Sequence, residues 1–213
     1  YGRAYDMVVS YTIRQEQDRS AETAPLIEES IQKVLDVSEE ISSLDFYQTL
    51  FKNAITDSFT DLADSPDAAS FSQKVDQLIT GTPVTNVKIY MEVPKDSPSD
   101  INALLNKEDL KDTFLSLDQV RGTYWYGIFR GSRVSQLFCP SFYLGTKEQK
   151  AYGDQAYITH ASVIYNNGTY DAYMAVYYSG HDFQQILSEN LTLDGSVSYI
   201  MNERNNLVSA SSD

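Results

Sequence analysis

The chain contains 213 residues, of which 16 are Lys or Arg and 30 are Asp or Glu, and its formal net charge is -14. This acidic balance argues against nucleic acid and against an anionic membrane surface as partners. The length suits one large or two small domains with a real core, no run approaches the roughly 18 apolar residues of a membrane span, and the single cysteine excludes an internal disulfide.

The first 80 residues are predicted to be helical. Between residues 26 and 44, apolar side chains recur about every 3.6 positions with acidic residues between them, which is the pattern of an amphipathic helix. Residues 5–19 carry a compatible pattern, and we interpret the whole stretch as one long N-terminal helix with a kink at Pro25.

Two further helices are predicted in the N-terminal region. Residues 46–63 show an apolar stripe and are predicted to form the second helix. The sequence Asp64-Ser65-Pro66 then combines a stop signal with a helix cap. A third helix is therefore predicted to run from there to Ile79, with Gly81 just past its end.

Strand signals follow the helices. Residues 84–93 alternate apolar and polar side chains, as a half-buried strand does. Short helical pieces are predicted from there as far as residue 117. Residues 136–144 form a second predicted strand, which Pro140 places near a sheet edge or a bulge because proline lacks the N–H of a central ladder. Residues 147–154 are predicted to be a polar loop.

The strongest strand signal is a hairpin formed by residues 155–165 and 170–178. Asn167-Gly168 lies between them and supplies the positive φ angles of a type I′ turn. Such a turn pairs Asn166 with Thr169 and thereby assigns every side chain to a face. One face is almost wholly apolar, is expected to pack against helices, and carries these residues: Tyr157, Thr159, Ala161, Val163, Tyr165, Tyr170, Ala172, Met174, Val176 and Tyr178.

The opposite face of the hairpin combines aromatic rings with hydroxyls, an imidazole and a carboxylate. Its candidate binding residues are His160, Ser162, Tyr173 and Tyr177, beside Asp171. Apolar walls with a few orienting polar groups are typical of a small-ligand pocket. The alternative interpretation is a half-solvated sheet face with exposed tyrosines.

The chain ends with a predicted short helix over residues 181–190 and a second hairpin within residues 197–210. Helices, antiparallel strands and a new hairpin in this order predict an α+β fold, in which the long N-terminal helix covers one face of the sheet. We therefore divide the chain into a helical region over 1–80, a sheet module over 81–190 and the beginning of a second module over 191–213.

Three segments of the chain resemble one family. They are the long N-terminal helix, the sequence from Tyr124-Trp125-Tyr126 through Cys139-Pro140-Ser141-Phe142-Tyr143 to the hairpin, and the closing segment 197–212. In this order they resemble the extracellular double-Cache, PAS-like sensor region of a bacterial two-component sensor histidine kinase. The resemblance implies a PAS-like antiparallel sheet in the membrane-distal module at 81–190, followed by a truncated membrane-proximal module.

The resemblance also implies a biological role. The region would lie on the extracytoplasmic side of a bacterial cell membrane, in a membrane-anchored receptor that forms a homodimer. It would bind a small molecule, or a solute-binding protein carrying one, and the N-terminal helix would transmit the signal. The kinase part lies outside this chain, so we expect the fragment to be no enzyme and to need no cofactor. The alternatives are the same region of a chemoreceptor, or a non-catalytic interaction or adhesion module.

Family members that bind amino acids combine an arginine, a Trp-Tyr pair, a later tyrosine and an aspartate at the end of the last distal strand. Arg121, Trp125, Tyr126 and Tyr143 match the first four roles in residue type. Arg121 lies farther from the Trp-Tyr pair than the pattern expects, however, and the last strand ends in Tyr177-Tyr178-Ser179 without a carboxylate. We therefore predict a neutral, aromatic or carboxylate ligand rather than an amino acid.

Several of these residues also have a structural interpretation. Trp125, the only tryptophan, would then be a core anchor with its indole N–H bonded. Arg121 would be a surface arginine rather than a bidentate clamp on a ligand carboxylate. His160 would be a hydrogen-bonded structural residue, and we assign Arg130 and Arg133 to a solvated turn.

Enzymatic motifs are lacking in the sequence. Cys139 with His160 or His181 is a poor nucleophile–base pair, because Pro140 follows at once and no helix N-terminus is predicted there to lower the thiol pKa. One cysteine and two histidines are a poor set of zinc ligands, and the phosphate-loop, G-x-S-x-G and H-E-x-x-H patterns are absent. The sequence therefore favours a binding function over a catalytic one.

Overall fold

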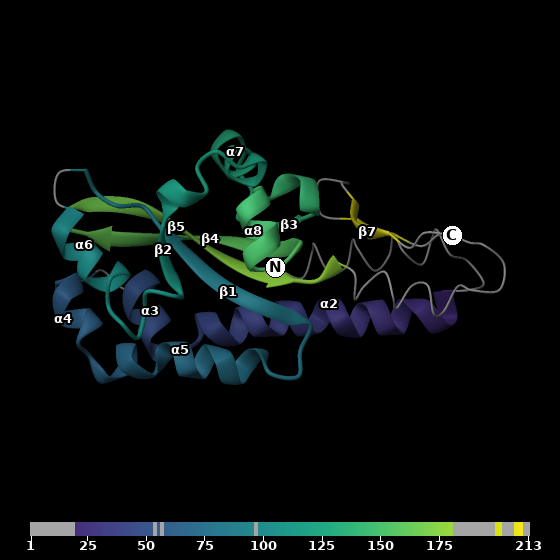
Figure 1. The fold of residues 1–213 in the computed structure, drawn as a ribbon, viewed down its shortest axis with the longest axis horizontal. Coiled ribbons are helices and arrows are strands. Elements are labelled where there is room, and N and C mark those ends of the chain that lie inside the picture. The colour runs from purple at the N-terminus through teal and green to yellow at the C-terminus, as the bar shows by residue number, and fades with distance from the viewer. Residues whose placement is uncertain are drawn as a thin grey trace.

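The protein has an α+β fold built around a five-stranded sheet, as the sequence predicts (Figure 1). The computed structural model describes residues 20–52, 55, 58–95, 98–180, 199–201 and 207–210. The helices below the sheet in Figure 1 are α2 (Ser20–Ser42), α3 (Asp45–Phe51), α4 (Phe59–Ala63) and α5 (Pro66–Ile79). The helices above it are α7 (Tyr124–Gly131) and α8 (Thr146–Ala151), while α6 (Pro98–Leu105) lies near α4.

The N-terminal helices follow the predicted order with one break. Helix α2 begins at Ser20, ahead of Pro25, and residues 1–19 lie outside the described residues, so the predicted extension of this helix stays a prediction. The single helix predicted over residues 46–63 is wrong, because α3 and α4 are separate. Between them the backbone N–H of Ile55 donates to the carbonyl of Ile164 at 3.0 Å, a bond to the hairpin that a continuous helix would forfeit.

The sheet is mixed rather than purely antiparallel. Its strands lie in the order β2-β1-β5-β4-β3 and have these bounds: β1 Val84–Met91, β2 Phe114–Ser116, β3 Gln136–Cys139, β4 Gln155–Tyr165 and β5 Gly168–Tyr178. The antiparallel sheet that we predicted is wrong at one edge, where β2 pairs in parallel with β1. At the other edge, β3 ends immediately before Pro140, which confirms the predicted edge position.

The register of the β4–β5 hairpin differs from the predicted one by two residues. The turn consists of Asn166 and Asn167, with φ angles of 52° and 64°, and Tyr165 pairs with Gly168. Asparagine tolerates these positive angles, so either Asn-Asn or Asn-Gly can form the turn. At Gly168 a Cβ atom would lie 2.8 Å from the hydroxyl of Tyr170, so glycine leaves room for that side chain. A shift of two residues keeps every side chain on its predicted face.

Two hydrophobic clusters bury opposite faces of the sheet. The larger joins α2, α3 and α5 to the predicted apolar face of the hairpin, including Tyr157, Met174 and Val176. The smaller joins α7 to the other face, including Ile158 and Tyr173. The predicted 1–80 region and the sheet module thus share one core, and α2 packs on the sheet as expected.

Other predicted segments have mixed outcomes. The polar loop expected over 147–154 is wrong, because α8 occupies most of it. Short 3₁₀ helices lie at Leu117–Gln119 and Ser141–Tyr143. The closing hairpin is present as β6 (Tyr199–Met201) paired with β7 (Leu207–Ala210), whereas the helix predicted over 181–190 lies outside the described residues.

Asp100 joins three elements at the α4 end of the sheet. Its carboxylate accepts hydrogen bonds from the backbone N–H groups of Phe59 at 3.0 Å and Thr60 at 3.1 Å, in the first turn of α4. The hydroxyl of Tyr165, at the end of β4, donates to the same carboxylate. Because Asp100 belongs to α6, this group holds α4 and α6 against the tip of the hairpin.

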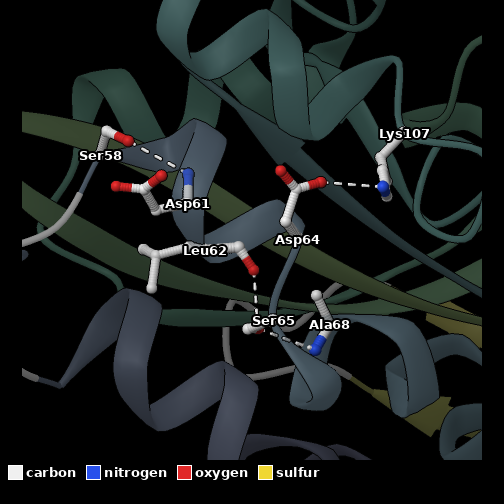
Figure 2. A network of polar contacts seen from close by, with 7 residues as sticks. All are labelled: Ser58, Asp61, Leu62, Asp64, Ser65, Ala68 and Lys107. Atoms are coloured by element: carbon white, nitrogen blue, oxygen red, sulfur yellow. Dashed lines mark hydrogen bonds and ion pairs between the residues drawn. The ribbon is translucent and has the colours of Figure 1, made fainter.

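Ser65 connects α4 to α5 (Figure 2). Its hydroxyl donates to the carbonyl of Leu62 at 2.7 Å and accepts from the backbone N–H of Ala68 at 3.2 Å. Beside it, Lys107 forms an ion pair of 2.9 Å with Asp64. The serine therefore satisfies the last turn of one helix and the first turn of the next.

The substitution Ser65→Ala is expected to lower the free energy of unfolding by about 1 kcal/mol, because α5 loses its N-cap. Ser70→Ala is a matched control on the same helix, since that exposed hydroxyl makes only a 3.4 Å contact with the carbonyl of Asp67. The control should stay within about 0.5 kcal/mol of the parent protein. Urea unfolding measures both variants, and equal losses would contradict the capping role.

Candidate functional site

Helix α7 carries the aromatic side chains of the predicted site. It begins after Thr123, whose hydroxyl accepts from the backbone N–H of Tyr126 as an N-cap. Trp125, Tyr126 and Phe129 lie on the buried side of this helix. The ring of Trp125 lies 5.5 Å from that of Tyr173 on β5, and the ring of Tyr126 lies 5.7 Å from it. These rings fill the space between α7 and the sheet.

Glu148, which the sequence analysis did not single out, is the polar centre of this layer. The indole N–H of Trp125 donates to its two carboxylate oxygens, at 3.3 and 3.2 Å. The hydroxyl of Tyr177 donates at 2.6 Å and the backbone N–H of Gly145 at 2.8 Å. The hydroxyls of Tyr177 and Tyr90 lie 2.6 Å apart, so the hydrogen-bonded chain continues to β1.

Burial governs the ionisation of this group of residues. Burial raises the pKa of Glu148, and the bonds from Tyr177, Gly145 and Trp125 oppose that rise. Burial also raises the pKa of Tyr177 and of Tyr90. The two phenols thus remain neutral donors, and the group is a structural link between α7, α8 and the sheet. The predicted core role of Trp125, with its indole N–H bonded, is confirmed.

The remaining residues that matched the amino-acid-binding pattern lie on either side of this layer. Arg121 is exposed, and its guanidinium is bonded to the carboxylate of Asp118 at 2.6 Å and to the hydroxyl of Tyr126 at 3.0 Å. Tyr143 is buried, with its ring 4.8 Å from that of Tyr124 and 4.9 Å from that of Phe142. The structure therefore brings Arg121, Trp125 and Tyr126 together around α7.

A pocket opens beside the end of α7, where the helix faces the start of β3 and the middle of the hairpin. We call it the α7 pocket. Its volume is about 310 Å³, at the small end of the range for ligand sites. Its lining includes these residues: Phe129, Arg130, Arg133, His160, Asp171 and Tyr173. Arg130 and Arg133 are exposed, as predicted for a solvated turn, although Arg130 belongs to the last turn of α7.

His160 and Asp171 form the polar wall of the α7 pocket. The imidazole Nε2 lies 2.8 Å from Oδ1 of Asp171, and these side chains are 32% and 31% exposed. The backbone N–H of Asp171 donates to Oε1 of Glu92 at 2.9 Å. The imidazole ring lies 5.0 Å from the ring of Tyr173. Ser162 pairs with Asp171 across the hairpin and is half-buried beside this wall.

Four of the predicted binding residues lie in two different environments. His160 and Tyr173 line the α7 pocket, whereas Trp125 and Tyr177 bind Glu148 in the interior. The thiol of Cys139 is buried, and burial raises its pKa well above the usual value, so the reactive thiolate is disfavoured. These positions favour the binding of a ligand at the α7 pocket.

None of the helices in the described part of the chain combines the length and the hydropathy needed to cross a bilayer. The same residues contain no group of three or more His, Cys, Asp or Glu side chains placed to hold a metal ion. Comparison with protein-family models, with curated proteins and with solved structures gives no match for this chain.

The substitution Glu148→Gln is expected to lower the free energy of unfolding by about 1–3 kcal/mol, because the amide places N–H groups against donors that now bond a carboxylate. Urea unfolding followed by the fluorescence of Trp125 reports directly on this group. Glu108→Gln is the matched control, since that side chain is 84% exposed and pairs only with Lys111.

The loss of stability in Glu148→Gln should also depend on pH. The pKa of Glu148 is higher in the folded state than in the unfolded state. The contribution of Glu148 to the free energy of unfolding is therefore largest below the unfolded-state pKa and is lost as pH rises through the folded-state pKa. The difference between the parent protein and Glu148→Gln should therefore shrink as pH rises from about 4.5. A difference that grows over this range would contradict the raised pKa.

Proposed function

We propose that this chain is the extracytoplasmic ligand-sensing region of a bacterial transmembrane receptor, a sensor histidine kinase, and that a small molecule binds in the α7 pocket. The observation that carries the proposal is the position of this pocket relative to α2. Residues of β4 and β5 line the pocket, and α2 packs against β5 on the opposite face of the sheet. A change at the pocket therefore has a direct route to the helix.

Strand β5 supplies that route residue by residue. Tyr173 lines the pocket, while its neighbours Ala172 and Met174 belong to the core shared with α2. Ile31, Val34 and Leu35 are α2 residues of that core. A ligand that binds one arrangement of the strand more tightly than another would bias the position of α2 by the difference in affinity.

The sequence supports the receptor assignment through its resemblance to a double-Cache region. In this proposal, the predicted extension of α2 leads toward the membrane, residues 81–190 form the membrane-distal module, and residues 191–213 begin the membrane-proximal one. The full receptor would be a membrane-anchored homodimer, and its kinase part would lie outside this chain. A solute-binding protein that carries the small molecule is an equivalent partner in this scheme, and a chemoreceptor would use the same region with a different output.

A second candidate function is a protein-interaction module. Much of the face that we predicted to be a pocket is filled by its own side chains. On the outer surface, Tyr124 and Phe142 are 62% and 67% exposed and both contact Tyr143. Exposed aromatic rings of this kind are enriched in protein interfaces. This module would place the binding surface on the outside of α7 rather than in the α7 pocket.

A thermal-shift screen against amino acids, small carboxylates, amines, purines and sugars tests the sensing function. A ligand present at about 100 times its dissociation constant should stabilise the fold by about 2.7 kcal/mol and raise the melting temperature by roughly 5–10 °C. His160→Ala should weaken that shift by removing one wall of the α7 pocket.

Ile164→Ala is the matched control for this screen. Ile164 shares the strand and the sheet face of His160 but is 53% exposed and lies outside the α7 pocket. The control should retain the full ligand-induced shift. A screen in which no compound gives a saturable shift would contradict the sensing function and favour the interaction module.

A further inference from the structure

We propose that the ligand of the α7 pocket is a small organic carboxylate, which Arg130 and Arg133 hold by its charged group while Phe129 and Tyr173 contact its apolar body. This inference rests on the proposed sensing function and names the chemical class of the ligand. It extends the expectation of a neutral, aromatic or carboxylate ligand by selecting one of the three.

The two arginines of the pocket lack protein partners. Arg121, outside the pocket, is bonded to Asp118 and Tyr126. Arg130 and Arg133, by contrast, form no ion pair or hydrogen bond with any residue that the structure describes. The chain as a whole carries 30 acidic residues against 16 basic ones, so carboxylate partners are abundant. Two guanidinium groups border one pocket, and each can bind an anion through the two parallel N–H bonds typical of arginine.

The helix dipole explains only one of these arginines. Arg130 lies in the last turn of α7, where a cation is stabilised by the carbonyl end of the helix. Helix α7 ends before Ser132, whose backbone is extended and whose hydroxyl donates to the carbonyl of Ile128 at 2.6 Å. Arg133 lies beyond this cap and gains nothing from the dipole. Its position at the pocket is therefore better explained by a ligand.

The carboxylates at the pocket already have hydrogen-bonding partners. Oδ1 of Asp171 lies 2.8 Å from the imidazole of His160, which donates to it when the aspartate is ionised. Glu92, close behind, accepts the backbone N–H of Asp171. Among the lining side chains, the two arginines also outnumber the one carboxylate, Asp171. This balance favours an anion over a cation.

The walls of the pocket define the rest of the ligand. The ring of Phe129 lies 5.1 Å from that of Tyr173, and both contribute apolar surface. Burial raises the pKa of the Tyr173 hydroxyl, Asp171 adds to that rise and Arg130 opposes it. A pocket of about 310 Å³ admits a compact molecule. The pocket therefore fits a short or aromatic carboxylate that has one apolar side.

Isothermal titration of the whole chain with benzoate and with benzamide tests the charge requirement. The two probes have nearly the same shape, but only benzoate is an anion. We expect benzoate to bind at least about tenfold more tightly than benzamide, which is the loss expected when a charge-assisted hydrogen bond is removed. Raising the salt concentration should weaken benzoate alone, because the arginines are exposed. If another carboxylate from the screen binds more tightly, it replaces benzoate and is compared with its own amide.

Arg130→Gln and Arg133→Gln should each weaken carboxylate binding by about tenfold, and Arg130→Lys should restore it only in part because lysine lacks the planar fork. Lys147→Gln is the matched control, since it removes an exposed cation from α8, outside the pocket, and should leave the affinity unchanged. Thermal melts of the free variants establish that each is folded before titration.

The two proposals fail in different ways. If a ligand from the screen depends on His160 but binds equally as acid and amide, or survives both arginine substitutions, the carboxylate inference is overturned and the sensing function stands. If no compound of any class binds, both are overturned. Carboxylate binding that is lost in either arginine variant and retained in Lys147→Gln supports both.

Discussion

The buried carboxylate of Glu148 is the interaction on which the arrangement of the outer layer depends. Its oxygens accept bonds from the indole of Trp125, the hydroxyl of Tyr177 and the backbone of Gly145. A carboxylate is costly to bury unless its oxygens are bonded, so α7, α8 and β5 stabilise one another only when all three are in place. This group thereby holds α7, whose last turn borders the α7 pocket, against the sheet.

The second constraint is that the half of the hairpin farther from the turn, residues 155–158 and 172–178, is buried on both faces. Successive residues of β5 alternate between the core with α2 and the layer under α7, so neither cluster can repack without moving the same backbone. Tyr165, at the tip of β4, is bonded to Asp100, which holds this end of the hairpin to α4 and α6. In the proposed sensing function, motion caused by a ligand would therefore be directed along the strands toward α2 rather than absorbed at the turn.

Local sequence signals predicted what depends on local structure. Ser65 and Pro66 marked the start of α5, and the faces of the hairpin followed from its alternation. Helix α8 was missed although it is local, whereas other failures involve partners distant in the sequence. Asn-Asn-Gly allows two turns, and only packing selects between them. The backbone N–H of Ile55, between α3 and α4, donates to the carbonyl of Ile164 in the hairpin, far along the sequence. Strand β2 is three residues long and exists because β1 lies beside it.

The functional site was predictable only in its residue types. An aromatic ring that fills a core and one that lines a pocket look alike in sequence, and Trp125 and His160 were equal candidates for that reason. What separates them is burial. Trp125 is buried with its indole bonded to Glu148, whereas His160, bonded to Asp171, lines the open α7 pocket. Arg130 and Arg133 border the same pocket and have no bonded partner among the described residues. In the proposed function, recognition would therefore depend on Arg130 and Arg133 more than on the aromatic layer beneath α7.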